Sequence, residues 1–137
     1  MICLLPEQLK DAGLLKATEM RTVYLENKEN KNFVLHELPI EAQFAPVYAI
    51  TSTDINRDGK KDLILAGNNA WTRIRYGRYE ASHGTVLTGD GKGNFKFIPP
   101  AQSGITVRGD VRSIEYIRPY LFFGINNQAA KIFSINK

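Results

Sequence analysis

The chain has 137 residues, a length that suits one domain with a sizeable hydrophobic core. Hydrophobic residues make up 43% of the chain and charged residues 23%, proportions that exclude wholesale disorder. The net charge of +4 is modest and spread along the chain, so we expect no nucleic-acid partner.

The N-terminal segment combines a short apolar run with a helical pattern. The run before Pro6 is too short for a signal-peptide core or a membrane span. We therefore expect no transmembrane segment, and either a cytoplasmic protein or a targeting sequence outside this chain. Residues 6–20 predict a short N-terminal helix, which Gly13 interrupts. Cys3 is the single cysteine, so no internal disulfide can form.

The remainder of the chain is predicted to be mainly β. Nine short segments are rich in β-branched or aromatic residues, and turn residues separate most of them. They are residues 22–27, 32–38, 46–53, 62–67, 84–89, 94–99, 111–117, 121–125 and 131–135. The sequence thus predicts an all-β fold.

A weak internal repeat relates successive parts of the chain. At a spacing of 62 residues, Leu25, Asn32 and Phe33 fall on Leu87, Asn94 and Phe95, and residues 48–53 fall on 110–115. At a spacing of 58, Asn68-Asn69 falls on Asn126-Asn127. The four-residue change lies at "YIRPY" (116–120), where the second copy lacks an acidic loop that the first copy has.

One repeat unit holds four antiparallel strands in roughly sixty residues, which is typical of a large β-propeller blade. The pattern places a helical lead-in at 1–21, half a blade at 22–45, a complete blade at 46–100 and a partial blade at 101–137. Together they make about two and a quarter blades, whereas a closed propeller has about 4–8. Because exposed edge strands associate, we expect this segment to form homo-oligomers or to belong to a longer propeller.

The acidic loop carries oxygen ligands at regular spacing within "STDINRDGKKDLILAG" (52–67). Counted from Asp54, the positions 1, 3, 5 and 9 are Asp54, Asn56, Asp58 and Asp62, and Lys60 at position 7 supplies a backbone carbonyl. Gly59 at position 6 allows a sharp turn. Calcium accepts such hard, irregularly placed oxygens, whereas transition metals favour His or Cys. The spacing therefore predicts a structural Ca²⁺ site.

The same spacing occurs in EF-hands, but two features exclude one here. An EF-hand needs a bidentate Glu at position 12, where this chain has Leu65, and a helix on each side. Both flanks of the loop are β-rich. The alternative to a calcium loop is a solvated acidic turn between two strands.

With these residues in place, "DINRDGKKDLILAGN" (54–68) resembles the DxNxDGxxDL motif of FG-GAP/VCBS repeats, the calcium-bearing blades of integrin-α-like propellers. Residues 42–50, 77–95 and 103–114 look more narrowly like bacterial VCBS-repeat proteins of the type often joined to an ASPIC/UnbV domain. The resemblance covers most of residues 22–128. It implies a seven-bladed propeller, an extracellular or cell-surface location, and calcium held by Asp54, Asn56, Asp58, the Lys60 carbonyl and Asp62.

Residues 71–83 interleave aromatic and cationic side chains, namely Trp71, Arg73, Arg75, Tyr76, Arg78 and Tyr79. Such a mixture can stack on bases or line a sugar site. The alternative is a long connection with packed aromatic rings and solvated arginines. Because binding residues collect on long loops, this stretch is the first candidate surface for a protein or carbohydrate ligand.

Three further motifs are weak. "GDGKGNF" (89–95) lacks the spacing of a phosphate-binding loop and predicts a hairpin turn that returns Phe95 to the core. "RGD" (108–110) is a tripeptide that some integrins read, but recognition needs an exposed loop tip. His36 and His83 have no Cys or Glu at ligand spacing, so each is predicted to be a packed or surface residue.

These observations predict a non-enzymatic calcium-binding propeller module for binding, scaffolding or adhesion. One alternative is the C-terminal part of a calcium-dependent propeller enzyme acting on carbohydrate. The acidic candidates for its chemistry are Glu80, Asp110 and Glu115. A second alternative is a structural segment with no ligand beyond the ion.

Overall fold

A computed structural model describes residues 13, 15–29, 32–72, 75 and 77–135. The nine predicted strands are confirmed, each with both ends within one residue of the prediction. They are β1 (Val23–Lys28), β2 (Asn32–Glu37), β3 (Val47–Thr53), β4 (Asp62–Gly67), β5 (Thr85–Gly89), β6 (Phe95–Ile98), β7 (Val111–Ile117), β8 (Tyr120–Ile125) and β9 (Lys131–Ser134).

The helical prediction for residues 6–20 is wrong for the part that the structure describes. Residues 13 and 15–20 are not helical, and the rest of that range lies outside the described residues. Leu15 is 97% exposed, so no packed apolar face supports a helix there. Two short helices that the sequence pattern missed are η2 (Ile40–Gln43) and α1 (Pro100–Ser103). No described helix is long and apolar enough to cross a membrane.

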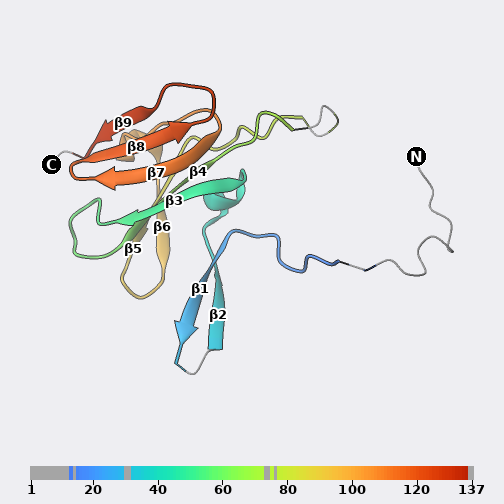
Figure 1. The fold of residues 1–137 in the computed structure, drawn as a ribbon. Coiled ribbons are helices and arrows are strands. Elements are labelled where there is room, and N and C mark those ends of the chain that lie inside the picture. The colour runs from blue at the N-terminus through green and yellow to red at the C-terminus, as the bar shows by residue number, and fades with distance from the viewer. Residues whose placement is uncertain (1–12, 14, 30–31, 73–74, 76, 136–137) are drawn as a thin grey trace.

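The strands form three antiparallel sheets of consecutive strands, and no sheet closes on itself (Figure 1). We name them the hairpin sheet (β1-β2), the central sheet (β3-β4-β5-β6) and the C-terminal sheet (β7-β8-β9). The register pairs Leu63 with Leu87 and Ile64 with Val86 in the central sheet. Because successive side chains point to opposite faces, β4 presents one apolar row to each side.

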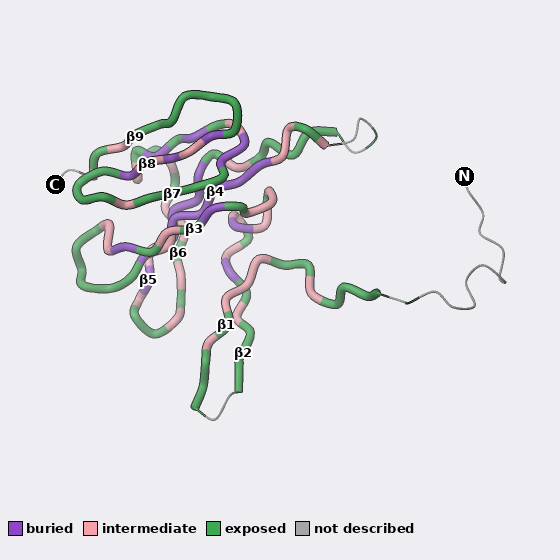
Figure 2. Tube along the Cα trace, in the orientation of Figure 1, coloured by how far each residue is buried: buried purple, intermediate pink, exposed green. Residues whose placement is uncertain are grey.

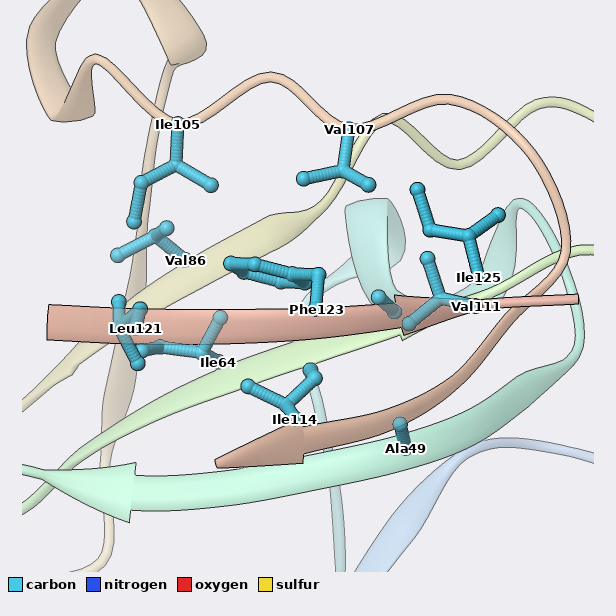
Figure 3. Close-up of a cluster of buried hydrophobic side chains, with 11 residues drawn as sticks. Ala49, Ile64, Val86, Ile105, Val107, Val111, Ile114, Leu121, Phe123 and Ile125 are labelled. Carbon is cyan, nitrogen blue, oxygen red and sulfur yellow. The ribbon is translucent and has the colours of Figure 1, made fainter. Parts of the chain in front are cut away.

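The main core lies between the central and C-terminal sheets. Ile64 and Val86 pack there against Val111, Leu121 and Phe123, all nearly or fully buried (Figure 3). Ile105 and Val107, from the segment between α1 and β7, cover one edge of this core. Burial on both faces accounts for the continuous apolar run of β4, which reads as a central strand.

A smaller cluster lies on the other face of the central sheet. Leu65 and Leu87 pack there with Leu38 and Ala42, the latter from η2. The hairpin sheet joins this cluster at one point, where the Tyr24 ring meets Phe95 edge-on at 5.6 Å between ring centroids. The central sheet is therefore covered on both faces, and Figure 2 shows the buried positions concentrated on it while the hairpin is mostly exposed.

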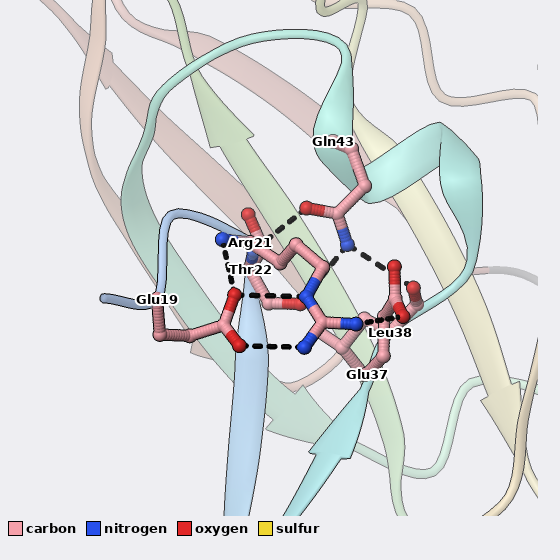
Figure 4. Close-up of polar contacts among 6 residues, drawn as sticks. All are labelled: Glu19, Arg21, Thr22, Glu37, Leu38 and Gln43. Atoms are coloured by element: carbon pink, nitrogen blue, oxygen red, sulfur yellow. Dashed lines mark hydrogen bonds and ion pairs between the residues drawn. The ribbon is translucent and has the colours of Figure 1, made fainter. Parts of the chain in front are cut away.

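Polar contacts fix the base of the hairpin sheet (Figure 4). The Gln43 side chain accepts a hydrogen bond from the Thr22 amide at 2.6 Å and donates to the carbonyls of Thr22 and Leu38. The Arg21 guanidinium bonds Glu19 and Glu37, each at 2.6 Å. The hydrogen bond from Arg21 lowers the pKa of Glu19 to about 2.

Tyr24 is predicted to hold the hairpin onto the rest of the protein. Its hydroxyl donates to the Gly93 carbonyl at 2.8 Å, and its ring stacks on His36 at 4.7 Å. Tyr24→Ala removes these contacts and should weaken docking of the hairpin by about 2 kcal/mol. Amide hydrogen exchange should then accelerate selectively in β1 and β2.

Leu25→Ala is the matched control for this variant. Leu25 is the next residue along β1, it points to the opposite face, and it is 59% exposed. We expect exchange in the hairpin to change little in this variant. Equal acceleration in both variants would show that Tyr24 has no special docking role.

The central and C-terminal sheets repeat the same local geometry. A bulge follows the first residue of both β3 and β7, Val47 and Val111. The amide of Asn68 bonds the Pro46 carbonyl, and that of Asn126 bonds the Asp110 carbonyl. These pairs put the first strands 64 residues apart, which corrects the spacing of 62 inferred from sequence. The acidic loop spans eight residues (54–61), and the corresponding connection between β7 and β8 spans two (118–119). The second connection is therefore six residues shorter, whereas the sequence alignment implied that it is four residues shorter.

Candidate metal site

The acidic loop, residues 54–61, connects β3 to β4. Two residues in the left-handed region turn the chain: Arg57 with φ of 62° and Gly59 with φ of 82°. Gly59 is the residue that the sequence pattern assigned to the sharp turn, and a left-handed φ explains that choice. The tip of the loop is exposed, whereas Asp62, the first residue of β4, is fully buried.

Side-chain oxygens of the loop accept hydrogen bonds from the backbone within it. The Asp58 amide donates to both Asp54 Oδ1 and Asn56 Oδ1 at 3.1 Å, so these two oxygens lie close together. Asp54 Oδ2 accepts from the Gly59 amide at 2.8 Å, and Asp58 Oδ1 from the Lys60 amide at 2.9 Å. The loop is thus wound by its own carboxylates, as short polar side chains do in turns.

Asp62 has a different role from the other predicted ligands. Its Oδ2 accepts from the Ile55 amide and its Oδ1 from the Gly89 amide, both at 2.9 Å. It therefore ties the start of the acidic loop and the end of β5 to β4. The sequence spacing placed Asp62 in the ligand set but did not reveal this bridge, because Gly89 is 27 residues away.

The donor set fits calcium in its chemistry and only partly in its arrangement. Asp54, Asn56 and Asp58 are brought together, and each carboxylate oxygen has a second lone pair beyond its backbone bond. However, no three side chains of His, Cys, Asp or Glu converge to hold a metal within the described residues.

The β5–β6 turn lies beside this loop. Asp90 Oδ1 accepts from the Lys92 and Asn94 amides, which confirms the predicted hairpin turn at residues 89–95. A hydrogen bond from the Asn94 side chain lowers the pKa of Asp90. Phe95 returns to the smaller cluster as expected. A side chain at Gly89 would collide with the Lys61 carbonyl, so glycine is required where the two connections meet.

The predicted aromatic and cationic surface is only partly described. Arg73 and Tyr76 lie outside the described residues. Trp71 is 77% exposed, and Arg75, Arg78 and Tyr79 are exposed as well. The backbone of Tyr79 pairs with that of Asn69 through hydrogen bonds of 2.8 and 3.0 Å. The connection is therefore closed at its base, and its two described rings, those of Trp71 and Tyr79, lie outside the core, contrary to the packed alternative.

The RGD tripeptide is not available for recognition. Asp110 is only 3% exposed, and its Oδ1 accepts from the Ala70 amide at 2.9 Å. The Arg112 guanidinium lies 3.6 Å from Asp110 Oδ2 and 4.1 Å from the centre of the Tyr48 ring. The Asn68 side chain, also buried, bonds the Gly109 carbonyl. Sequence reasoning missed this polar cluster, because its members come from three separate segments: Tyr48, residues 68–70 and residues 109–112.

The two histidines are surface residues, as the sequence predicted, and Glu115 lies apart from the other two acidic candidates. His36 is half-exposed and stacks on Tyr24, and His83 is exposed. Glu115 lies on β7 as an exposed residue. Glu80 and Asp110, by contrast, both line one small cavity.

Comparison with known proteins finds no matching family model, no similar curated protein and no similar solved structure. The resemblance of residues 54–68 to FG-GAP/VCBS repeats therefore stays a prediction, supported by the motif alone.

Proposed function

We propose that this chain is a calcium-binding, non-enzymatic β-propeller segment of FG-GAP/VCBS type that serves in binding or scaffolding at the cell surface. The observation that carries the proposal is the acidic loop. Asp54, Asn56 and Asp58 gather at its tip, and neither of its two carboxylates forms an ion pair with a described Lys, Arg or His. Two carboxylates without a cationic partner in one short loop favour a cation between them.

The proposed ligands are Asp54, Asn56, Asp58, the Lys60 carbonyl and Asp62. Calcium, when bound, supplies the positive charge that offsets the loop carboxylates. The chain itself contributes the winding of the loop through its backbone bonds, and Asp62 anchors the loop to β4 and β5. Both of the Asp62 bonds leave lone pairs free on its oxygens.

The arrangement of the sheets supports the propeller part of the proposal. Three separate antiparallel sheets follow one another in the chain, and the central one is covered on both faces. The hairpin sheet leaves Leu25, Phe33 and Leu35 more than 40% exposed. Further sheets, from a longer chain or from a second copy, would cover that face. A stable compact monomer in size-exclusion chromatography would contradict self-association.

The calcium proposal is tested by thermal unfolding in a chelator and in excess calcium. Binding to the folded state alone should raise stability by about 2.7 kcal/mol when calcium is a hundredfold above its dissociation constant. Asp58→Ala should abolish this increase, and magnesium should produce a smaller one, because it requires a more regular octahedral site.

Asp90→Ala is the matched control for Asp58→Ala. Asp90 is also an aspartate that bonds backbone amides in a β-turn, but it lies outside the acidic loop. It should retain the full calcium effect. If the wild-type protein shows no stabilisation by calcium, the acidic loop is only a solvated turn and the proposal fails.

A further inference from the structure

A small cavity lies at the opposite end of β4 from the acidic loop. Its volume is about 90 Å³, several times the roughly 10–15 Å³ that one water needs. Three segments meet around it: the start and end of the 70–80 connection, the turn before β7, and the turn after β8. The lining side chains that matter are those of Trp71, Arg78, Glu80, Asp110, Asn127 and Gln128.

Asp110 is the feature that points to a ligand. Asp110 is only 3% exposed, and its Oδ2 has no hydrogen-bond partner in the described part of the chain. The nearest cation, the Arg112 guanidinium, is 3.6 Å away, beyond hydrogen-bonding distance. Buried acceptors without a donor cost free energy, and they are rare in folded proteins. The Arg112 charge offsets part of that cost, and a donor in the cavity would supply the missing hydrogen bond.

The charges around the cavity favour a neutral ligand. Glu80 pairs with Arg78 at 2.9 Å, and Asp110 lies beside Arg112, so two carboxylates face two guanidinium groups. A free anion or cation would meet no net opposite charge. The ligand must nevertheless donate a hydrogen bond to Asp110, which a hydroxyl group does.

The remaining walls suit a hydroxylated ring. The side-chain amides of Asn127 and Gln128 are exposed and make no hydrogen bond to another described residue, so both donors and acceptors are free. Trp71 is exposed and also lines the cavity. A flat aromatic surface beside convergent polar groups is the usual composition of a small-ligand site.

We propose that this cavity binds a saccharide, with one ring hydroxyl donating to Asp110 Oδ2, the Asn127 and Gln128 amides bonding neighbouring hydroxyls, and the Trp71 indole packing against the ring. No part of the calcium proposal is required. The six residues of β4 separate the two sites by roughly 20 Å, so a failure of either proposal leaves the other standing.

Trp71 is the single tryptophan of the chain, so its fluorescence reports on this cavity alone. The protein is titrated with D-glucose, D-galactose, D-mannose and N-acetyl-D-glucosamine, and with the acyclic polyol sorbitol as a reference. A saturable change with at least one cyclic sugar is expected. Asp110→Asn should weaken that sugar by about 10–100-fold, the effect of losing one hydrogen bond to a charged group.

Two further variants keep the test decisive if Asp110→Asn folds poorly. Gln128→Ala changes an exposed side chain and should also weaken binding. Glu115 is an exposed carboxylate outside the cavity, so Glu115→Gln should leave sugar binding unchanged. No saturable change with any of the four sugars, or a change that survives both Asp110→Asn and Gln128→Ala, would overturn the assignment and mean that the cavity holds solvent only.

Discussion

Asp62→Ala is expected to lower the free energy of unfolding by about 2–4 kcal/mol, even in the absence of calcium. The fully buried carboxylate accepts one hydrogen bond from Ile55 and one from Gly89. Alanine leaves both amides without a partner, and each unsatisfied buried group costs about 1–3 kcal/mol. Denaturant unfolding in a chelator measures the effect.

The comparison with Asp58→Ala separates an anchor from a ligand. Asp58 lies at the exposed tip of the same loop, so its replacement should cost well under the Asp62 value in chelator, about 1 kcal/mol or less. Should Asp62→Ala match Asp58→Ala in chelator and differ from wild type only in calcium, Asp62 would be a metal ligand without a structural role.

Phe123→Ala is expected to have the second large effect, a loss of about 3–5 kcal/mol. Phe123 is the largest fully buried side chain among the described residues, and it fills the centre of the core between the central and C-terminal sheets (Figure 3). Its ring also meets Phe133 edge-on at 5.5 Å. Removing it leaves a cavity that neighbouring sheets cannot fill without moving. The midpoint of urea unfolding reports the loss.

Phe122→Ala provides the control on the same strand. Phe122 is the preceding residue of β8, points to the outer face and is only partly buried. The same change of side chain there should cost about 1 kcal/mol. A similar loss in both variants would mean that the outer face of the C-terminal sheet is covered as well, as it would be by a further sheet in an oligomer.

The two candidate sites show different limits of sequence reasoning. The acidic loop could be found because its groups lie at fixed spacing within nine residues, and its winding through Gly59 follows from the local sequence. The cavity at Asp110 could not be found in this way. The sequence offered Glu80 and Asp110 without a reason to pair them.

The sequence by itself determined the nine strands, their turns and the acidic loop, because alternating side chains, glycines and short polar residues act over a few positions. Only the tertiary structure decided which polar groups are buried. Asp62 reaches Gly89 and Asp110 reaches Ala70 because the packing of sheets and connections brings distant segments together. Tertiary packing also decides the N-terminal segment. The predicted helix is absent at residues 15–20 because the chain there meets no apolar surface that would hold a helix.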